Sequence, residues 1–284
     1  MENTRTKTTR NSLILLLTAA IWGMAFVSQS KGMDYMHPFT FNGVRSLIGA
    51  ASILVYILIS RKIAGDKAAP LDWKLNVKAG LLCGIFLTIA STLQQFGIKY
   101  TSVGKAGFIT TLYIIFVPMF GIFLKKKVAP VVWAAAVMAA VGMYLLCMTE
   151  SLRLGAGDIM VFLCAIAFAI QIMTVDHYAA RIDGAVVSCI QFTVCGVVCC
   201  IGALIWGQPT FGQLQEGLGA LLYAGVLSCG VGYTLQIVGQ KGLNPTVAAL
   251  IMSLESAFAA LGGWLILHQT MTAWELLGCG LLFA

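Results

Sequence analysis

The sequence has few charged residues and lacks the motifs of common enzyme classes. Only 10% of its 284 residues are charged, against about 25% in soluble domains. The three histidines, His37, His177 and His268, lie far apart, and no Walker motif, G-x-G-x-x-G after a strand or H-E-x-x-H occurs. These absences exclude a disordered protein and ATP hydrolysis by this chain, and they argue strongly against a soluble enzyme.

The nine cysteines show no pattern typical of metal or disulfide chemistry. They are scattered through apolar stretches, no C-x-x-C pair recurs, and no cluster of histidines accompanies them. In such surroundings cysteine behaves as a small apolar residue. We therefore expect the cysteines to pack between helices, and we expect neither a metal nor a cofactor.

The chain is rich in long apolar stretches. Apolar residues make up 59% of it, and its mean hydropathy is +0.90. About 20 apolar residues form a helix that crosses the bilayer. The sequence predicts an all-α membrane protein with ten such helices, at 12–31, 38–60, 77–98, 103–124, 130–148, 158–179, 184–206, 217–239, 246–267 and from Thr272 to Ala284. The last stretch is short, so we expect the natural chain to continue beyond Ala284 into a short basic tail.

The basic residues indicate how the chain crosses the membrane. If the N-terminus lies in the cytoplasm, 13 of the 18 basic residues fall on that side, four fall outside, and Arg45 lies within a span. This excess is typical of cytoplasmic loops. We therefore expect a multi-pass protein of the cell membrane with both termini in the cytoplasm. The net charge of +7 then reflects topology and contact with anionic lipids rather than nucleic-acid binding.

The second half of the chain repeats the first. At an offset of 142, ten residues between positions 92 and 121 are identical to their counterparts, beginning with Thr92-Leu93-Gln94 and Thr234-Leu235-Gln236. The repeat aligns spans three and four with spans eight and nine, so each unit has five helices. Because five is odd, the second unit enters the membrane from the opposite side. We predict two inverted five-helix repeats, residues 1–150 and 151–284, an arrangement common in secondary transporters.

These features resemble a known family. Trp22-Gly23, Arg45 and Ser253-Leu254-Glu255, together with the repeat, are similar to the EamA-type transporters of the drug/metabolite transporter superfamily. The resemblance covers nearly the whole chain. It implies ten helices, no catalysis, and transport of a small metabolite.

Charged residues inside the spans are the first candidates for a functional site, because a charge in lipid is costly. Glu255 is near the middle of span nine, where it could carry a proton, neutralise a cation, bind a substrate amine, or serve as a structural carboxylate. Its counterpart in the repeat, Tyr113, is expected to face it. Arg45 could compensate charge or bind a carboxylate, although its place near the outer surface favours a structural role. Asp158, near the start of span six, is expected to be solvated at the interface.

Uncharged polar and aromatic residues within the spans complete the candidate site. Span three carries two polar stripes, of which we expect the one with Ser91 and Gln94 to line a cavity and the one with Thr92 and Gln95 to pack on a helix. Pro118 is expected to kink span four. The predicted substrate-binding residues are Trp22, Gln94, Tyr113, Gln171, Tyr233, Gln236 and Glu255.

The most favoured function is a secondary transporter that exports a small organic metabolite, an amino acid or a related compound. The alternatives are an importer or exchanger of a cationic or sugar-type metabolite, and a multidrug exporter. A membrane enzyme would need clustered histidines or carboxylates, and a channel would need charged rings or a filter. The expected partners are a small-molecule substrate and the lipid bilayer, and the protein is expected to be a monomer or a homodimer.

Overall fold

The computed structural model describes residues 4–65, 70–101, 103–123 and 155–268, a few residues between 130 and 141, and Leu277. Every regular element in this part of the chain is a helix. Eight helical segments are long and apolar enough to cross a membrane: Lys7–Gly32, Pro38–Ala64, Trp73–Ile98, Val103–Phe123, Ala156–Tyr178, Gly184–Gly207, Leu218–Gln240 and Pro245–Ile266. They agree with eight of the ten predicted spans. Apart from those few residues, the spans predicted at 130–148 and from Thr272 lie outside the described part of the chain, as does the expected continuation beyond Ala284.

Polar residues begin several of these helices. His37 caps α2 (Pro38–Ala64), whose first residue is proline. Asp72 caps α3 (Trp73–Ile98), and Asp183 caps α8 (Gly184–Gly202). Asn244 caps α12 (Pro245–Met252). These side chains accept hydrogen bonds from backbone N–H groups that a helix start leaves unpaired, so each span has a defined first residue.

Two spans are interrupted at equivalent positions of the repeat. Leu112 separates α4 (Val103–Thr111) from α5 (Tyr113–Phe123). Ser253 and Leu254 separate α12 from α13 (Glu255–Leu267). Pro118 lies inside helix α5, so the interruption at Leu112 is separate from the kink that we expect at the proline. The consequence is that Tyr113 and Glu255 each begin a half-helix deep within a span.

The span 218–240 is also irregular. It consists of α10 (Leu218–Leu222), the π-helical segment η3 (Tyr223–Gly232) and α11 (Tyr233–Gln240). The preceding span ends in a short π-helical turn, η2 (Ala203–Gly207), and α9 (Phe211–Glu216) lies in the connection. Departures from the α-helix inside spans are common at functional sites.

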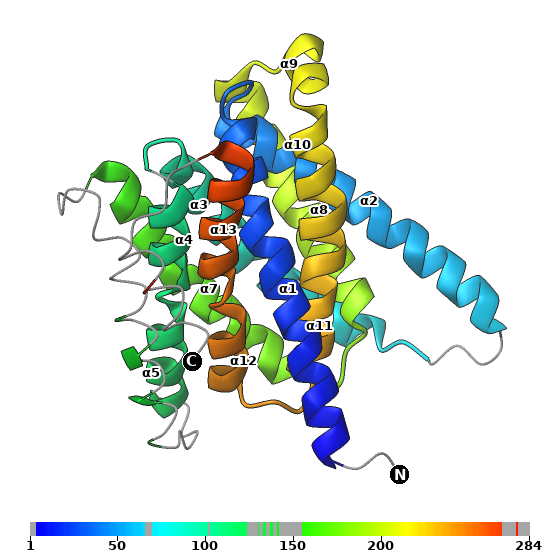
Figure 1. Cartoon of the computed structure of the whole chain (residues 1–284). Helices are drawn as coiled ribbons and strands as arrows, with labels where there is room; N and C mark the ends of the chain where they lie inside the picture. Colours follow the sequence, from blue (N-terminus) through cyan, green and yellow to red (C-terminus); the bar gives the residue numbers. More distant parts are fainter. Residues whose placement is uncertain are drawn as a thin grey trace.

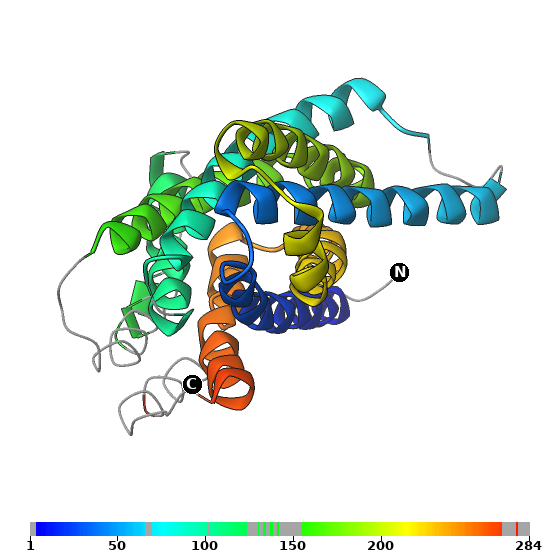
Figure 2. The ribbon, with the colours of Figure 1, turned by 90° about the horizontal axis from the view of Figure 1, so that it is seen from above.

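The two halves of the chain interlock. Helix α1 (Thr4–Gly32) packs against α11, α13 and η3 of the second half, and α7 (Ala156–Tyr178) packs against α3, α4 and α5 of the first half. Between them, α2 and α3 pack on α8. Figures 1 and 2 show this bundle from the side and from above. Residues from both halves therefore meet at its centre.

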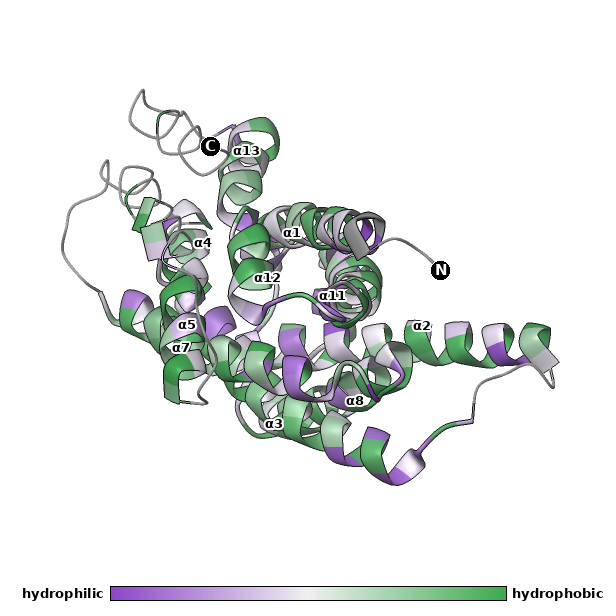
Figure 3. Ribbon diagram, turned by 90° about the horizontal axis from the view of Figure 1, so that it is seen from below, coloured by the Kyte–Doolittle hydropathy of each residue, from purple (hydrophilic) through white to green (hydrophobic). Residues whose placement is uncertain are grey.

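The helix surfaces suit a lipid environment. Apolar residues predominate along the helices (Figure 3), and many large ones are exposed, among them Leu58, Ile63 and Phe123. Small residues allow close helix packing: a Cβ atom added at Gly80 would lie 2.7 Å from the Ile190 side chain of α8. The described chain is thus an all-helical membrane protein.

Candidate functional site

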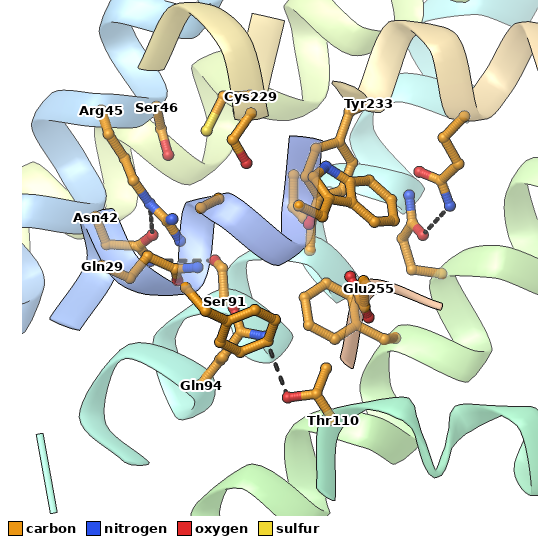
Figure 4. A pocket seen from close by; sticks show the side chains of 18 of the residues that line it. Gln29, Asn42, Arg45, Ser46, Ser91, Gln94, Thr110, Cys229, Tyr233 and Glu255 are labelled. Carbon is orange, nitrogen blue, oxygen red and sulfur yellow. Dashed lines mark hydrogen bonds between the residues drawn. The ribbon is translucent and has the colours of Figure 1, made fainter. Parts of the chain in front are cut away.

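A cavity lies at the centre of the bundle, between the two halves (Figure 4). The seven predicted substrate-binding residues and Arg45 all line it, and their neighbours in its wall include Phe26, Gln29, Asn42, Ser46, Ser91, Thr110, Phe168, Phe192 and Cys229. Its volume is about 30 Å³, which is room for about two water molecules. No organic metabolite fits into this space until helices separate.

Glu255 lies at the first position of α13 and is only 4% exposed. The Tyr113 hydroxyl, from the first position of α5, donates a 3.0 Å hydrogen bond to its Oε1 atom. The positive end of the α13 dipole also favours a carboxylate at this position. The two residues are separated by 142 positions, so the residue pair that the repeat aligns is in direct contact.

Four glutamine side chains form much of the polar wall. Gln94 donates to the Thr110 hydroxyl at 3.2 Å, and Gln236 donates to the Gln171 amide oxygen at 3.2 Å. The amide oxygens of Gln29 and Gln236 are buried and have no hydrogen-bond partner within the described part of the chain. Such acceptors are costly to leave unpaired. They are suited to hydrogen-bond donors of a bound molecule.

Aromatic rings form another part of the wall. Trp22 and Tyr233 lie with their ring centroids 4.5 Å apart, and Phe192 meets Tyr233 edge-on at 4.9 Å. The indole N–H of Trp22 is buried and finds no acceptor among the described residues. The wall therefore combines apolar surface with a few polar groups, which is typical of a small-molecule site.

Arg45 lies in the cavity wall, whereas the sequence led us to expect it near the outer surface in a structural role. The side chain is 5% exposed and lines the cavity, so it does not extend to the lipid headgroups. Its Nε donates a 2.9 Å hydrogen bond to the Asn42 side chain, and its guanidinium lies 5.5 Å from the centre of the Phe41 ring. Sequence reasoning could not choose this direction, because the rotation of α2 about its axis is set by its packing on α8 and η3.

The two polar stripes of α3 separate as predicted. Ser91 and Gln94 line the cavity, whereas the Gln95 amide donates to the backbone oxygen of Gln29 on α1 at 3.2 Å. Thr92 contacts Cys199 of α8 at 3.5 Å. Gln29, by contrast, was missed from the sequence. The repeat offset alone would have found it, since Gln29 and Gln171 lie 142 residues apart.

Asp158 is buried rather than solvated at the interface. It is 4% exposed and forms a 2.7 Å ion pair with Lys105. The Thr101 hydroxyl and the Gly155 backbone N–H also donate to it. The pair joins the start of α4 in the first half to the start of α7 in the second. No local sequence signal marks it, because 53 residues separate the partners.

The described residues include no group of three or more His, Cys, Asp or Glu side chains that could hold a metal ion. The cysteines they include are free and mostly buried. Several contact polar side chains, as when Cys195 lies 3.4 Å from the Ser46 hydroxyl.

In the described part of the chain, eight candidate spans form an all-helical bundle around a buried cavity whose apolar wall carries a few polar groups, which defines a multi-pass membrane protein. Sequence comparison names the family. The model of the EamA-like transporter family matches residues 10–148 and again 155–284, so the chain belongs to that family and is a membrane transporter. The two matches also suggest an internal repeat.

Sequence relatives agree with this membership, and a solved structure shows the same fold. An uncharacterized transporter of Archaeoglobus fulgidus is 27% identical over 274 residues, which cover 94% of this chain and 82% of the relative. The uncharacterized transporter YwfM of Bacillus subtilis is 26% identical, with 95% and 90% covered. A crystal structure with a TM-score of 0.76 and 16% identity covers 97% of this chain and 94% of its own, and it shows the same fold.

Proposed function

We propose that this protein is a secondary transporter that exports a small organic metabolite, an amino acid or a related compound, by alternating access. It is built from two inverted five-helix repeats, residues 1–150 and 151–284, with ten spans and both termini in the cytoplasm. The cargo binds in the central cavity to Trp22, Gln94, Tyr113, Gln171, Tyr233, Gln236 and Glu255.

The contact between Tyr113 and Glu255 carries this proposal. Two inverted repeats are related by a two-fold axis in the membrane plane. A residue touches its own counterpart only near that axis, so the 3.0 Å hydrogen bond supports an axis that runs through the cavity. A site on the axis is equally distant from both membrane surfaces. The same residues can then face either side when the repeats exchange conformations.

The small volume of the cavity, about 30 Å³, supports a closed state between the inward and outward forms. The Lys105–Asp158 ion pair joins the two halves at one end of the bundle. Opening towards that end must break or stretch it. Glu255 is the group that couples the cycle to a proton or neutralises the charge of the cargo.

The test is counterflow in proteoliposomes with each of the twenty radiolabelled L-amino acids under a controlled pH gradient. We expect accumulation of at least one amino acid. Absence of counterflow for all twenty would contradict the amino-acid assignment.

Glu255→Gln tests the proposed role of the carboxylate. We expect the variant to lose transport, or the pH dependence of transport, while its expression and its elution in gel filtration stay normal. Glu216→Gln, an exposed position on α9, is the control for removal of a carboxylate. Normal transport by Glu255→Gln over a wide pH range would return Glu255 to a structural role.

A further inference from the structure

Arg45 is a buried cation with no carboxylate of the described residues beside it. Its only hydrogen bond to the described residues is the one from Nε to Asn42, and no carboxylate of that part of the chain lies within ion-pair distance. Figure 4 shows Arg45 and Glu255 at opposite sides of the cavity. A guanidinium in the membrane interior is costly unless an anion or several acceptors pair with it. The two terminal nitrogens of Arg45 are thus left for a bound molecule.

The neighbours of Arg45 hold its guanidinium in a fixed orientation. Asn42 accepts from Nε, and the Asn42 amide nitrogen itself donates to the Ser91 hydroxyl at 3.1 Å and to the Cys199 sulfur at 3.3 Å. These bonds assign the amide of Asn42 a single orientation and connect α2 to α3 and α8. A guanidinium held through Nε presents its two terminal nitrogens as a fork, which matches the two oxygens of a carboxylate.

Arg45 and Glu255 are the charged residues of the described cavity wall, and neither has a charged counterpart in the repeat. Several lining residues occur as identical pairs 142 positions apart: Phe26 and Phe168, Gln29 and Gln171, and Gln94 and Gln236. Arg45, in contrast, corresponds to Val187, and Glu255 corresponds to Tyr113. Identical residue pairs cannot distinguish the two ends of a bound molecule, whereas a single cation and a single carboxylate can. The charges therefore orient the cargo in the cavity.

We propose that Arg45 binds the carboxylate of the transported molecule, while Glu255 receives its ammonium group. This inference rests on the proposed transport function and assigns each end of the amino acid to a residue. Asn42 is a positioning residue, because it acts through Arg45. The requirement for a carboxylate excludes simple amines and neutral sugars as good cargo.

The first experiment needs no substitution. Thermal unfolding of the purified wild-type protein is measured with each L-amino acid and with its carboxamide, in which the carboxylate is neutral. A bound molecule raises the unfolding temperature. We expect stabilisation by at least one amino acid and none by its amide. Equal stabilisation by acid and amide would overturn the role of Arg45, even if that amino acid is transported.

The second experiment compares variants in counterflow. Arg45→Gln removes the charge, and we expect KM for the stabilising amino acid to rise roughly 10- to 100-fold, the range for a lost hydrogen bond to a charged group. Arg45→Lys keeps the charge but lacks the two-nitrogen fork, so its KM should rise less than that of Arg45→Gln. Lys62→Gln, exposed on the same helix, should leave KM unchanged. If Arg45→Gln folds, as gel filtration reports, and transports with unchanged KM, the proposal is wrong.

A third arm separates this inference from the proposed function. Propionate, lactate and pyruvate carry a carboxylate but no ammonium group. If no amino acid binds, yet these acids stabilise the wild type and fail to stabilise Arg45→Gln, the amino-acid function fails and the carboxylate site stands. If no carboxylate of either kind stabilises the wild type, the inference fails.

Discussion

Replacing Gly23 by alanine tests whether the close approach of α1 and α13 positions the cavity. A Cβ atom at Gly23 would lie 2.3 Å from Phe258 Cβ, 2.7 Å from the Glu255 backbone oxygen and 2.8 Å from the Ala259 backbone nitrogen. Ordinary contact distances are about 3.5–4.0 Å. Two of these neighbours are backbone atoms that cannot rotate away, so the two helices must separate by about 1 Å or more. Overpacking of this kind costs about 1–3 kcal/mol.

The expected result has a stability part and a transport part. Thermal unfolding in detergent should show a midpoint lower by several degrees. Because the Glu255 backbone oxygen is one of the displaced atoms, the carboxylate should move relative to Tyr113, and counterflow should fall even where the protein remains folded. Gly23 belongs to the Trp22-Gly23 pair on which the family resemblance partly rests. Close packing of α1 on α13 explains why this position holds a glycine.

Gly104→Ala is the matched control. Gly104 lies in α4, and a Cβ atom there meets nothing within 4 Å. Alanine also has the higher helix propensity, so stability and transport should be equal to or above those of the wild type. Unchanged unfolding and transport in Gly23→Ala, or an equal loss in Gly104→Ala, would refute the packing argument.

Three further predictions concern other contacts. Tyr113→Phe removes the donor to the cavity carboxylate, so transport should fall at least about tenfold, with no change in gel filtration; full activity would contradict the role of the hydroxyl. Asp158→Asn or Lys105→Met breaks a buried ion pair and should lower the free energy of unfolding by about 3 kcal/mol, measured as a lower unfolding midpoint. A double variant that exchanges the two charges should restore part of this stability. A double variant no more stable than the single variants would argue against a direct pair. Burial, followed by the charge of Lys99, lowers the pKa of His37 below its usual 6.5. The folded state therefore binds this proton less readily than the unfolded state, and stability should decline as the pH falls below 6.5; His37→Asn should reduce the decline, and an unchanged decline would assign it to other groups.

The spans could be predicted from the sequence because each depends on its own residues. A helix in lipid satisfies its backbone hydrogen bonds internally, so an apolar run of sufficient length is enough to define it. The eight spans within the described residues match their predicted ranges to within a few positions. The interruptions at Leu112 and at Ser253–Leu254 were not visible, since no proline or glycine occupies those positions.

The candidate site could be predicted in part. The cost of a charge in lipid singles out Glu255, and the repeat offset pairs it with Tyr113. The same offset relates Gln94 to Gln236. These arguments need only the sequence, because they concern the chemistry of one residue or the alignment of two segments.

Only the tertiary structure decided which way side chains face and which distant residues meet. It turned Arg45 into the cavity and paired Lys105 with Asp158. It also added Gln29 and Asn42 to the wall. The physical reason is that a helix satisfies its backbone alone but is free to rotate about its axis, and only packing against helices from the other half of the chain selects the face that borders the cavity.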